Sequence, residues 1–83
     1  MTKVLLVDDH QMFLDGVTNI LIKDPELKKI GEARDGELAL KLLKKESKNV
    51  NVVVMDVEMN HMGGIEATKE IKKLYPFINV LIL

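Results

Sequence analysis

Three aspartates in this sequence each follow or end a short apolar run. Asp8 and Asp9 come directly after the run at residues 4–7, and Asp56 ends the run at residues 50–56. Carboxylate oxygens suit Mg²⁺, which typically takes one or two carboxylates together with a phosphate oxygen and waters. An aspartate can also attack phosphorus and become an acyl phosphate. If folding gathers these side chains, they predict a magnesium site in which Asp56 is a phosphoryl acceptor.

The strands that precede these acids decide whether they meet. The runs at residues 4–7, 50–56 and 78–83 are apolar on both faces, which is typical of parallel strands covered on both sides. Leu27–Ala33 is more polar, and it predicts a strand at the edge of the sheet.

The segments between the strands have the apolar spacing of helices. A first helix is predicted at residues 11–23, a second begins with Asp35 as its N-cap, and a third follows Gly63 and Gly64. The predicted buried faces are, in chain order, Phe13, Val17, Ile20 and Leu21; Leu38, Ala39, Leu42 and Leu43; and Ile65, Thr68, Ile71 and Leu74.

The alternation β-α-β-α-β-α-β predicts an α/β domain with a parallel, doubly wound sheet and helices on both faces. In the flavodoxin-like strand order, here 2-1-3-4, the first and third strands are neighbours, and ligands bind beyond their carboxyl ends. Asp8, Asp9 and Asp56 follow or end those two strands. Three carboxylates at one place repel one another, so the prediction includes a cation, Mg²⁺, between them.

The composition fits one small, packed domain. The chain has 83 residues, of which 47% are hydrophobic. Its 12 basic and 13 acidic residues leave a net charge of −1, so we expect no direct nucleic-acid contact by this segment. Cysteine is absent, which excludes disulfides and thiolate metal sites. Because no apolar run approaches the ~18–20 residues of a membrane span, we predict a cytoplasmic protein without membrane contact.

These features together resemble the response-regulator receiver (CheY-like) domain over the whole chain. The residues that carry the resemblance are the acidic pair after the first strand, the Asp-Val-Glu-Met run at residues 56–59, Gly64 eight residues past Asp56, and Glu66 with Ala67. The resemblance implies a regulatory domain of two-component signal transduction, not an enzyme.

The resemblance also implies roles for individual residues. Asp56 would accept a phosphoryl group from a sensor histidine kinase. Mg²⁺ would be held by Asp8, Asp9, Asp56 and the backbone carbonyl of Glu58, with Asp9 the more direct ligand and Asp8 binding largely through water. The loop around the phosphoryl site would contain Met59, Gly63 and Gly64.

The start of the chain is similar to one branch of this family. Asp8, Asp9 and His10, followed by Phe13 and the Gly-Val pair at residues 16–17, resemble the NarL/FixJ type of transcriptional regulator. In that branch the receiver precedes a helix-turn-helix output domain. Contact with DNA would then belong to an output domain outside this sequence.

Two departures from the family pattern lead to further expectations. Asn60 stands where the family usually has proline, which removes a restriction on the unfolded loop. The family also continues past residue 83 with a fourth helix, a fifth strand and a fifth helix, so residues 1–83 are expected to be an incomplete receiver. A hydroxyl and a lysine in that continuation contact the phosphoryl group, so we expect poor phosphorylation. The strand at residues 78–83 is expected to be an exposed edge through which the chain forms a homodimer or oligomer.

Other interpretations of the same residues stay open at this stage. A magnesium-dependent phosphohydrolase would also use an aspartate nucleophile, but it usually has a second aspartate two residues later, where this chain has Glu58. A flavodoxin-like small-molecule binder would be expected to have Ser, Thr or Gly after the first strand. His10 follows the acidic pair and could tune proton or phosphate chemistry, but it is interpreted as a polar residue at the start of the first helix. The glycines at 63 and 64 could let a ligand approach closely, and they fit a tight start of the third helix equally well.

Overall fold

The computed structural model describes residues 1–57 and 62–83. Strands and helices alternate along the described chain, as the sequence predicts. The elements are β1 (Thr2–Val7), α1 (Gln11–Leu21), β2 (Leu27–Ala33), α2 (Gly36–Glu46), the 3₁₀ turn η1 (Ser47–Asn49), β3 (Val52–Met55), α3 (Gly64–Leu74) and β4 (Asn79–Ile82).

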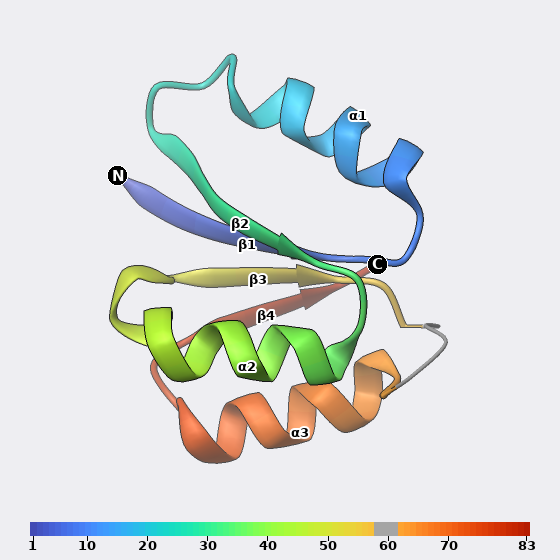
Figure 1. The fold of residues 1–83 in the computed structure, drawn as a ribbon. Helices are drawn as coiled ribbons and strands as arrows, with labels where there is room; N and C mark the ends of the chain where they lie inside the picture. The colour runs from blue at the N-terminus through green and yellow to red at the C-terminus, as the bar shows by residue number, and fades with distance from the viewer. Residues whose placement is uncertain (58–61) are drawn as a thin grey trace.

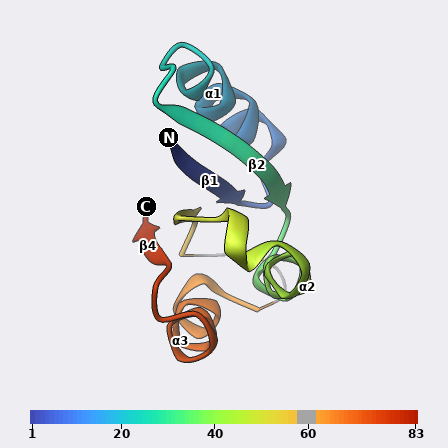
Figure 2. The same ribbon diagram turned by 90° about the vertical axis from the view of Figure 1, so that its left-hand side faces the viewer.

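The four strands form one parallel sheet in the order β2-β1-β3-β4. The α/β class, the parallel pairing and the order predicted from the sequence are confirmed. Helix α1 covers one face of the sheet, and α2 and α3 lie side by side on the other (Figures 1 and 2). Strand β2 is at one edge of the sheet, as its polar composition predicts, and β4 is at the other.

The core has two parts, because β1 and β3 are covered on both faces. Leu5 and Val7 of β1 point toward α2 and α3, and they pack with Val53, Ala39 and other buried side chains. The alternate residues of β1, Val4 and Leu6, pack instead against Leu14 and Leu21 of α1. This alternation explains why the strands are apolar on both faces.

The face of α1 that packs on the sheet differs from the predicted one. Phe13 and Ile20 were expected to be buried, but their side chains are exposed, Ile20 to 67%. Leu21 is buried and Val17 packs against the same cluster, as predicted, and Leu14, which the prediction left out, completes the buried face. The spacing of these three residues, i, i+3 and i+7, also forms one helix face, and the sheet selects it.

The predicted faces of α2 and α3 need a similar correction. Ala39, Leu43 and Ile71 are buried as expected, whereas Leu38, Ile65 and Leu74 are exposed. The two helices approach each other closely where α2 begins. A Cβ on Gly36 would lie 2.7 Å from the Cβ of Ala67, so small residues, not large apolar ones, fill the contact.

The ends of the elements explain how the chain enters and leaves them. Asp35 caps α2 as predicted, because its side chain accepts a hydrogen bond of 2.8 Å from the Leu38 amide.

Strand β4 is shorter than the apolar run that predicts it, and only Ile78 of that run is fully buried. Among the helices of the described residues, none is long and apolar enough to cross a membrane.

Candidate functional site

The carboxyl ends of β1 and β3 lie next to each other, and the acids follow both. The hydrogen-bond ladder continues one residue past each strand: the Asp8 amide donates to the Ala33 carbonyl at 3.0 Å, and the Asp56 amide donates to the Val7 carbonyl at 3.0 Å. These two bonds fix the backbone of both aspartates to neighbouring strands. The adjacency of β1 and β3 thus brings residues 48 positions apart to one edge of the sheet.

Four side chains meet at this edge. One ligand atom from each of Asp8, Asp9, His10 and Asp56 lies within 4.8 Å of all the others. Asp8 is buried, with 4% of its surface exposed, and Asp9 is half-buried. Asp56 is half-buried like Asp9, and His10 is exposed, so the site opens to solvent at His10, with Asp8 at its base.

The ring of His10 lies among the three carboxylates. Its Nδ1 is 2.9 Å from Oδ1 of Asp8, 3.0 Å from Oδ1 of Asp9 and 4.0 Å from Oδ2 of Asp56. The hydrogen bond to Asp8, followed by the charge of Asp9, raises the pKa of His10. The sequence interpretation of His10 as a plain polar residue at the helix start was incomplete. It does occupy the N-cap position of α1, but its side chain turns to the acids.

The hydrogen bonding of one Asp9 oxygen indicates whether these residues fit a cation. Its Oδ1 is buried, and within the described part of the chain it accepts no hydrogen bond. The nearby Nδ1 of His10 bonds to Asp8 instead. A buried carboxylate oxygen without a donor is costly. A divalent cation would satisfy it, so the donor set fits Mg²⁺.

Arg34, at the end of β2, is a residue that the sequence interpretation missed. Its Nη2 donates to the backbone carbonyl of Asp9 at 2.8 Å, and its Nη1 donates to Oε1 of Gln11 at 2.8 Å. The guanidinium thus connects the edge strand to the loop that carries Asp9. A signal existed in the sequence, since Arg34 directly follows β2 as Asp8 directly follows β1.

The glycines of the predicted phosphoryl-site loop lie next to the backbone of Asp56 and Val57. The Gly64 amide donates to the Val57 carbonyl at 3.0 Å, and a Cβ on Gly64 would overlap the Asp56 carbonyl oxygen. Gly63 has more room, with Val57 O 3.6 Å from its ideal Cβ position. Gly64 therefore lets α3 begin directly against the backbone of Asp56. The predicted roles of Glu58 and Met59 lie outside the described residues.

Comparison with known proteins assigns this arrangement to a family. Residues 4–83 match the model of the response regulator receiver domain. The chain belongs to this receiver family. The resemblance predicted from the acidic pair and the residues around Asp56 is confirmed.

The relatives of this receiver include regulators of transcription. Over 98% of its length it is 38% identical to the transcriptional regulatory protein DegU of Brevibacillus brevis and 38% identical to the response regulator protein VraR of Staphylococcus aureus. It spans 34% and 38% of those two proteins, a little over a third of their length. Another relative carries an enzyme name: a protein-glutamate methylesterase/glutaminase of Pyrococcus horikoshii is 41% identical over 96% of this chain, which covers 21% of that enzyme.

Solved structures share the fold. A CheX–CheY–BeF₃–Mg²⁺ complex from Borrelia burgdorferi contains a chain that superposes with a TM-score of 0.92 at 28% identity, over 98% of this chain and 60% of that one. A LuxR-family two-component response regulator from Aurantimonas gives a TM-score of 0.88 at 31% identity, over 99% and 58%.

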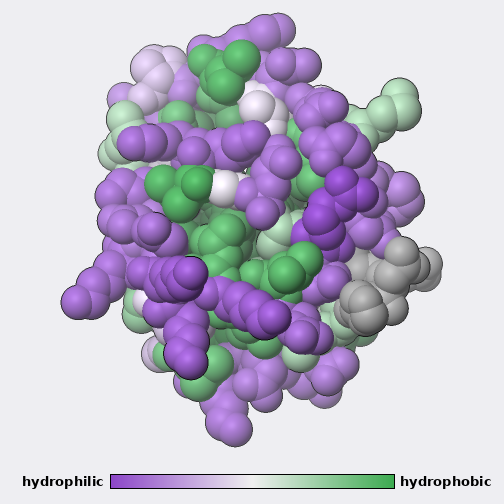
Figure 3. Space-filling view, viewed as in Figure 1, coloured by the Kyte–Doolittle hydropathy of each residue, from purple (hydrophilic) through white to green (hydrophobic). Residues whose placement is uncertain are grey.

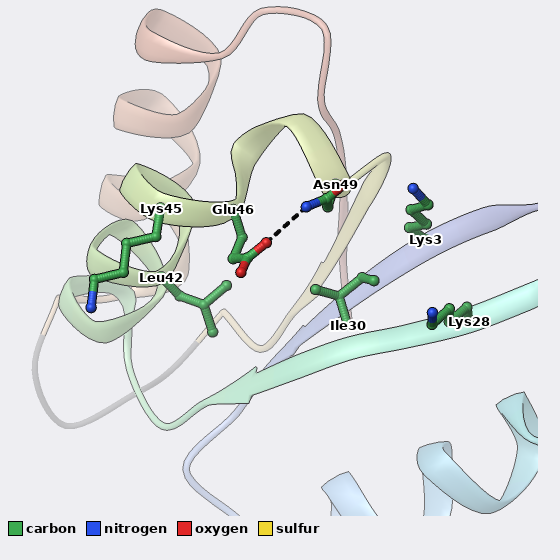
Figure 4. Close-up of a pocket in the computed structure, with 7 residues that line it drawn as sticks. All are labelled: Lys3, Lys28, Ile30, Leu42, Lys45, Glu46 and Asn49. Carbon is green, nitrogen blue, oxygen red and sulfur yellow. Dashed lines mark hydrogen bonds between the residues drawn. The ribbon is translucent and has the colours of Figure 1, made fainter.

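A separate hollow lies at the opposite end of the sheet. A cavity of about 510 Å³ lies between β2 and the end of α2. Figure 4 shows Ile30 and Leu42 among its lining residues, with the lysines at 3, 28 and 45 around it. In Figure 3, hydrophobic side chains lie in a hollow over these elements, and hydrophilic side chains surround it. Lys3 and Lys28 are near the amino ends of their strands, whereas the aspartates follow the carboxyl ends. The cavity is therefore not part of the acidic site.

Proposed function

We propose that this receiver accepts a phosphoryl group on Asp56 from a sensor histidine kinase. Mg²⁺ would be held by Asp8, Asp9, Asp56 and the backbone carbonyl of Glu58. The observation that carries the proposal is the cluster of carboxylate oxygens at the ends of β1 and β3, in which one buried oxygen of Asp9 lacks a hydrogen-bond donor among the described residues. The similar Borrelia complex contains Mg²⁺ together with BeF₃.

The chemistry required of the chain is modest. An oxygen of the Asp56 carboxylate attacks the phosphorus of a phosphohistidine, and a P–O bond forms as the P–N bond breaks. The departing imidazole keeps the electron pair of that bond and takes a proton from solvent. A bound Mg²⁺ supplies positive charge that offsets the charge of the phosphoryl oxygens. Asp8 and Asp9 hold the cation, and the ladder bond from the Asp56 amide to Val7 holds the nucleophile in place.

The output of the switch is proposed from the relatives. DegU is named as a transcriptional regulatory protein, and VraR as a response regulator. We infer that Asp56 controls transcription through a DNA-binding domain outside residues 1–83, and that this segment itself makes no contact with DNA or membrane. The cytoplasmic location expected from the sequence remains a prediction.

The test is a phosphorylation assay that reads out the acceptor. The protein is incubated with MgCl₂ and acetyl phosphate, and its intact mass is measured. We expect a minor fraction of the protein to gain the mass of one phosphoryl group, and this gain to be lost on chelation of the metal and in Asp56→Asn. Asp15→Asn is the matched control, since it makes the same change at an exposed residue of α1. A phosphoryl group on another residue, or steady hydrolysis of a phosphoester, would contradict the proposal.

We also propose that the protein self-associates through β4. This strand is paired on one side with β3 and stands at the end of the sheet. The side chains of Leu81 and Leu83 are more than half exposed. The free side of such a strand presents backbone groups that can pair with a second copy. The partner we propose is therefore another molecule of the same chain.

A further inference from the structure

We infer that Nδ1 of His10 is a ligand of the cation held by Asp8, Asp9 and Asp56, so that the site takes transition ions such as Ni²⁺ and Zn²⁺ as well as Mg²⁺. The inference rests on the proposed metal site and adds a nitrogen ligand to it. It assigns His10 a part in choosing the metal.

The distances fit a shared coordination sphere. Two ligand atoms about 2.1 Å from one metal lie roughly 3 Å apart when they are adjacent, and roughly 4.2 Å apart when they are opposite. Nδ1 of His10 is 2.9 and 3.0 Å from oxygens of Asp8 and Asp9, and 4.0 Å from Oδ2 of Asp56. The first two spacings match adjacent ligands, and the third is close to the spacing of opposite ones.

The hydrogen bonding also leaves a place for a cation. Nδ1 of an imidazole carries at most one hydrogen, so it donates one good hydrogen bond. It is bonded to Oδ1 of Asp8, and Oδ1 of Asp9, at 3.0 Å from the same nitrogen, is left as a buried acceptor without a donor among the described residues. A metal ion that replaces this hydrogen, which leaves to solvent as a proton, can contact all three atoms at once, and the imidazole then keeps its remaining hydrogen on Nε2.

The backbone holds His10 near the site while its ring stays free to adjust. The His10 amide donates to Oδ1 of Asp8 at 2.8 Å, which fixes the start of the side chain. The side chain is 72% exposed, and within the described chain it makes no capping hydrogen bond to α1. Small rotations that bring Nδ1 to bonding distance of a metal therefore break no contact with the core.

A nitrogen ligand changes which metals the site prefers. Imidazole suits Zn²⁺, Ni²⁺ and Cu²⁺, whereas carboxylates, carbonyls and water suit Mg²⁺. Removal of His10 should therefore weaken binding of the transition ions while it leaves binding of Mg²⁺ nearly unchanged. This difference separates a ligand from a residue that only adds local charge, because a charge would act on every divalent ion alike.

The experiment compares two ions in three proteins by calorimetric titration with MgCl₂ and NiCl₂ at a fixed pH. His10→Phe keeps an aromatic ring but has no nitrogen. We expect its affinity for Ni²⁺ to fall about tenfold or more, since even outer-shell partners of metal ligands contribute 10–100-fold. The affinity for Mg²⁺ should change less than about twofold. His61→Ala, at the only other histidine in the sequence, should keep the Ni²⁺ affinity of the parent protein.

A spectroscopic readout identifies the nitrogen directly. In ¹H–¹⁵N spectra of the histidine rings, ZnCl₂ should shift the Nδ1 signal of His10. Equal losses for both ions in His10→Phe, no loss for either, or a loss of Ni²⁺ binding in His61→Ala alone would overturn the inference. Asp9→Asn distinguishes failure of the proposed function from failure of the inference about His10. If this substitution leaves Mg²⁺ binding intact, the proposed function fails. If it removes Mg²⁺ binding while His10→Phe alters neither ion, only the inference about His10 fails.

Discussion

The three aspartates of the site are held by different contacts, although their side chains are identical. Asp8 is buried, and its Oδ1 accepts bonds from both the amide and the ring of His10. Asp56 follows β3 and is fixed by its amide. Asp9 has its backbone carbonyl held by Arg34. Because each carboxylate is positioned separately, a change in one support should loosen one ligand and not the whole site.

Removal of the Arg34 guanidinium tests whether Asp9 is positioned separately from the other two aspartates. In Arg34→Ala the Asp9 carbonyl and Gln11 each lose a hydrogen bond of 2.8 Å. We expect the affinity for Mg²⁺ to fall about tenfold, at the lower end of the ~10–100-fold range of residues that position metal ligands. The stability to urea should change by less than about 1 kcal/mol, because Arg34 is exposed.

The comparison variant for Arg34 is Lys28→Ala, which removes one positive charge at the other end of the same strand. It should leave Mg²⁺ affinity unchanged. An equal effect of the two substitutions would show that Arg34 acts through net charge, and the positioning role would be wrong.

At the scale of elements, the start of α3 depends on one glycine. No glycine in the described chain has a positive φ, so the requirement at Gly64 is one of space. An added Cβ would overlap the Asp56 carbonyl oxygen and lie 2.8 Å from Cα of Val57. We expect Gly64→Ala to lower the free energy of unfolding by about 1–3 kcal/mol, as in other overpacked sites, and to weaken metal binding through Asp56.

Gly63 provides the matched control, one residue earlier. Among the described residues, its ideal Cβ meets only Val57 O at 3.6 Å, and its φ of −72° suits any residue. Gly63→Ala should therefore change the free energy of unfolding by less than about 0.5 kcal/mol. Urea denaturation of both variants checks the pair. Equal destabilisation would mean that flexibility, and not space, is what the helix start needs.

Polar side chains connect the edge strand β2 to α1, and their contribution to stability should depend on pH. Lys29 donates to Glu32 at 2.8 Å and to Thr18 at 3.1 Å. The bond from Lys29 lowers the pKa of Glu32 from its usual 4.5. The ionised form is therefore stabilised by folding. Its contribution is present above pH 4.5 and is lost as the pH falls through the lower pKa of the folded state.

Glu32→Gln should show this dependence in urea denaturation. At pH 7 we expect a loss of about 0.2–1 kcal/mol, because both side chains are about a quarter exposed. At a pH below the folded pKa the variant and the parent should be equally stable. Glu37→Gln, whose pair with Lys41 is 4.0 Å long and mostly exposed, should have a smaller effect. A Glu32→Gln loss that is the same at both pH values would contradict the assignment to charge.

At the scale of the whole molecule, one sheet supports two separate surfaces. The carboxyl ends of β1 and β3 form the acidic site, and the outer side of β4 forms an apolar edge. Strand β4 is connected to the acidic site through β3. The Leu83 amide donates to the carbonyl of Met55, the residue before Asp56, at 2.9 Å. The proposed association at this edge would therefore take place one strand away from Asp56, the proposed phosphoryl acceptor.

Sedimentation at micromolar concentrations tests the proposed self-association. We expect the parent protein to form dimers or larger species, and Leu81→Arg to shift it toward monomer because charges on an edge strand oppose pairing. Leu74→Arg makes the same change on α3 at nearly equal exposure, 54% against 53%, and should associate like the parent. A monodisperse parent monomer, or equal effects of the two arginines, would contradict association through β4.

The sequence predicted the fold through patterns that act locally. Runs of apolar residues on both strand faces, the Asp35 cap and the alternation of elements depend only on neighbours in the chain. The parallel pairing follows from general rules of connection, and the strand order was taken from the flavodoxin-like fold. The buried faces of the helices could not be predicted as well. Two apolar stripes fit α1 by spacing, and the contact of Gly36 with Ala67 depends on how closely α2 approaches α3.

The same division holds at the site. The sequence alone identified Asp8, Asp9 and Asp56, because carboxylates that follow or end two strands of a parallel sheet must share an edge when those strands are neighbours. Only the tertiary structure revealed the ring of His10 among these acids and the link from Arg34 to Asp9. Those contacts depend on side-chain rotation and on where β2 ends relative to β1. A one-dimensional pattern does not contain either quantity, since both arise from packing across the sheet.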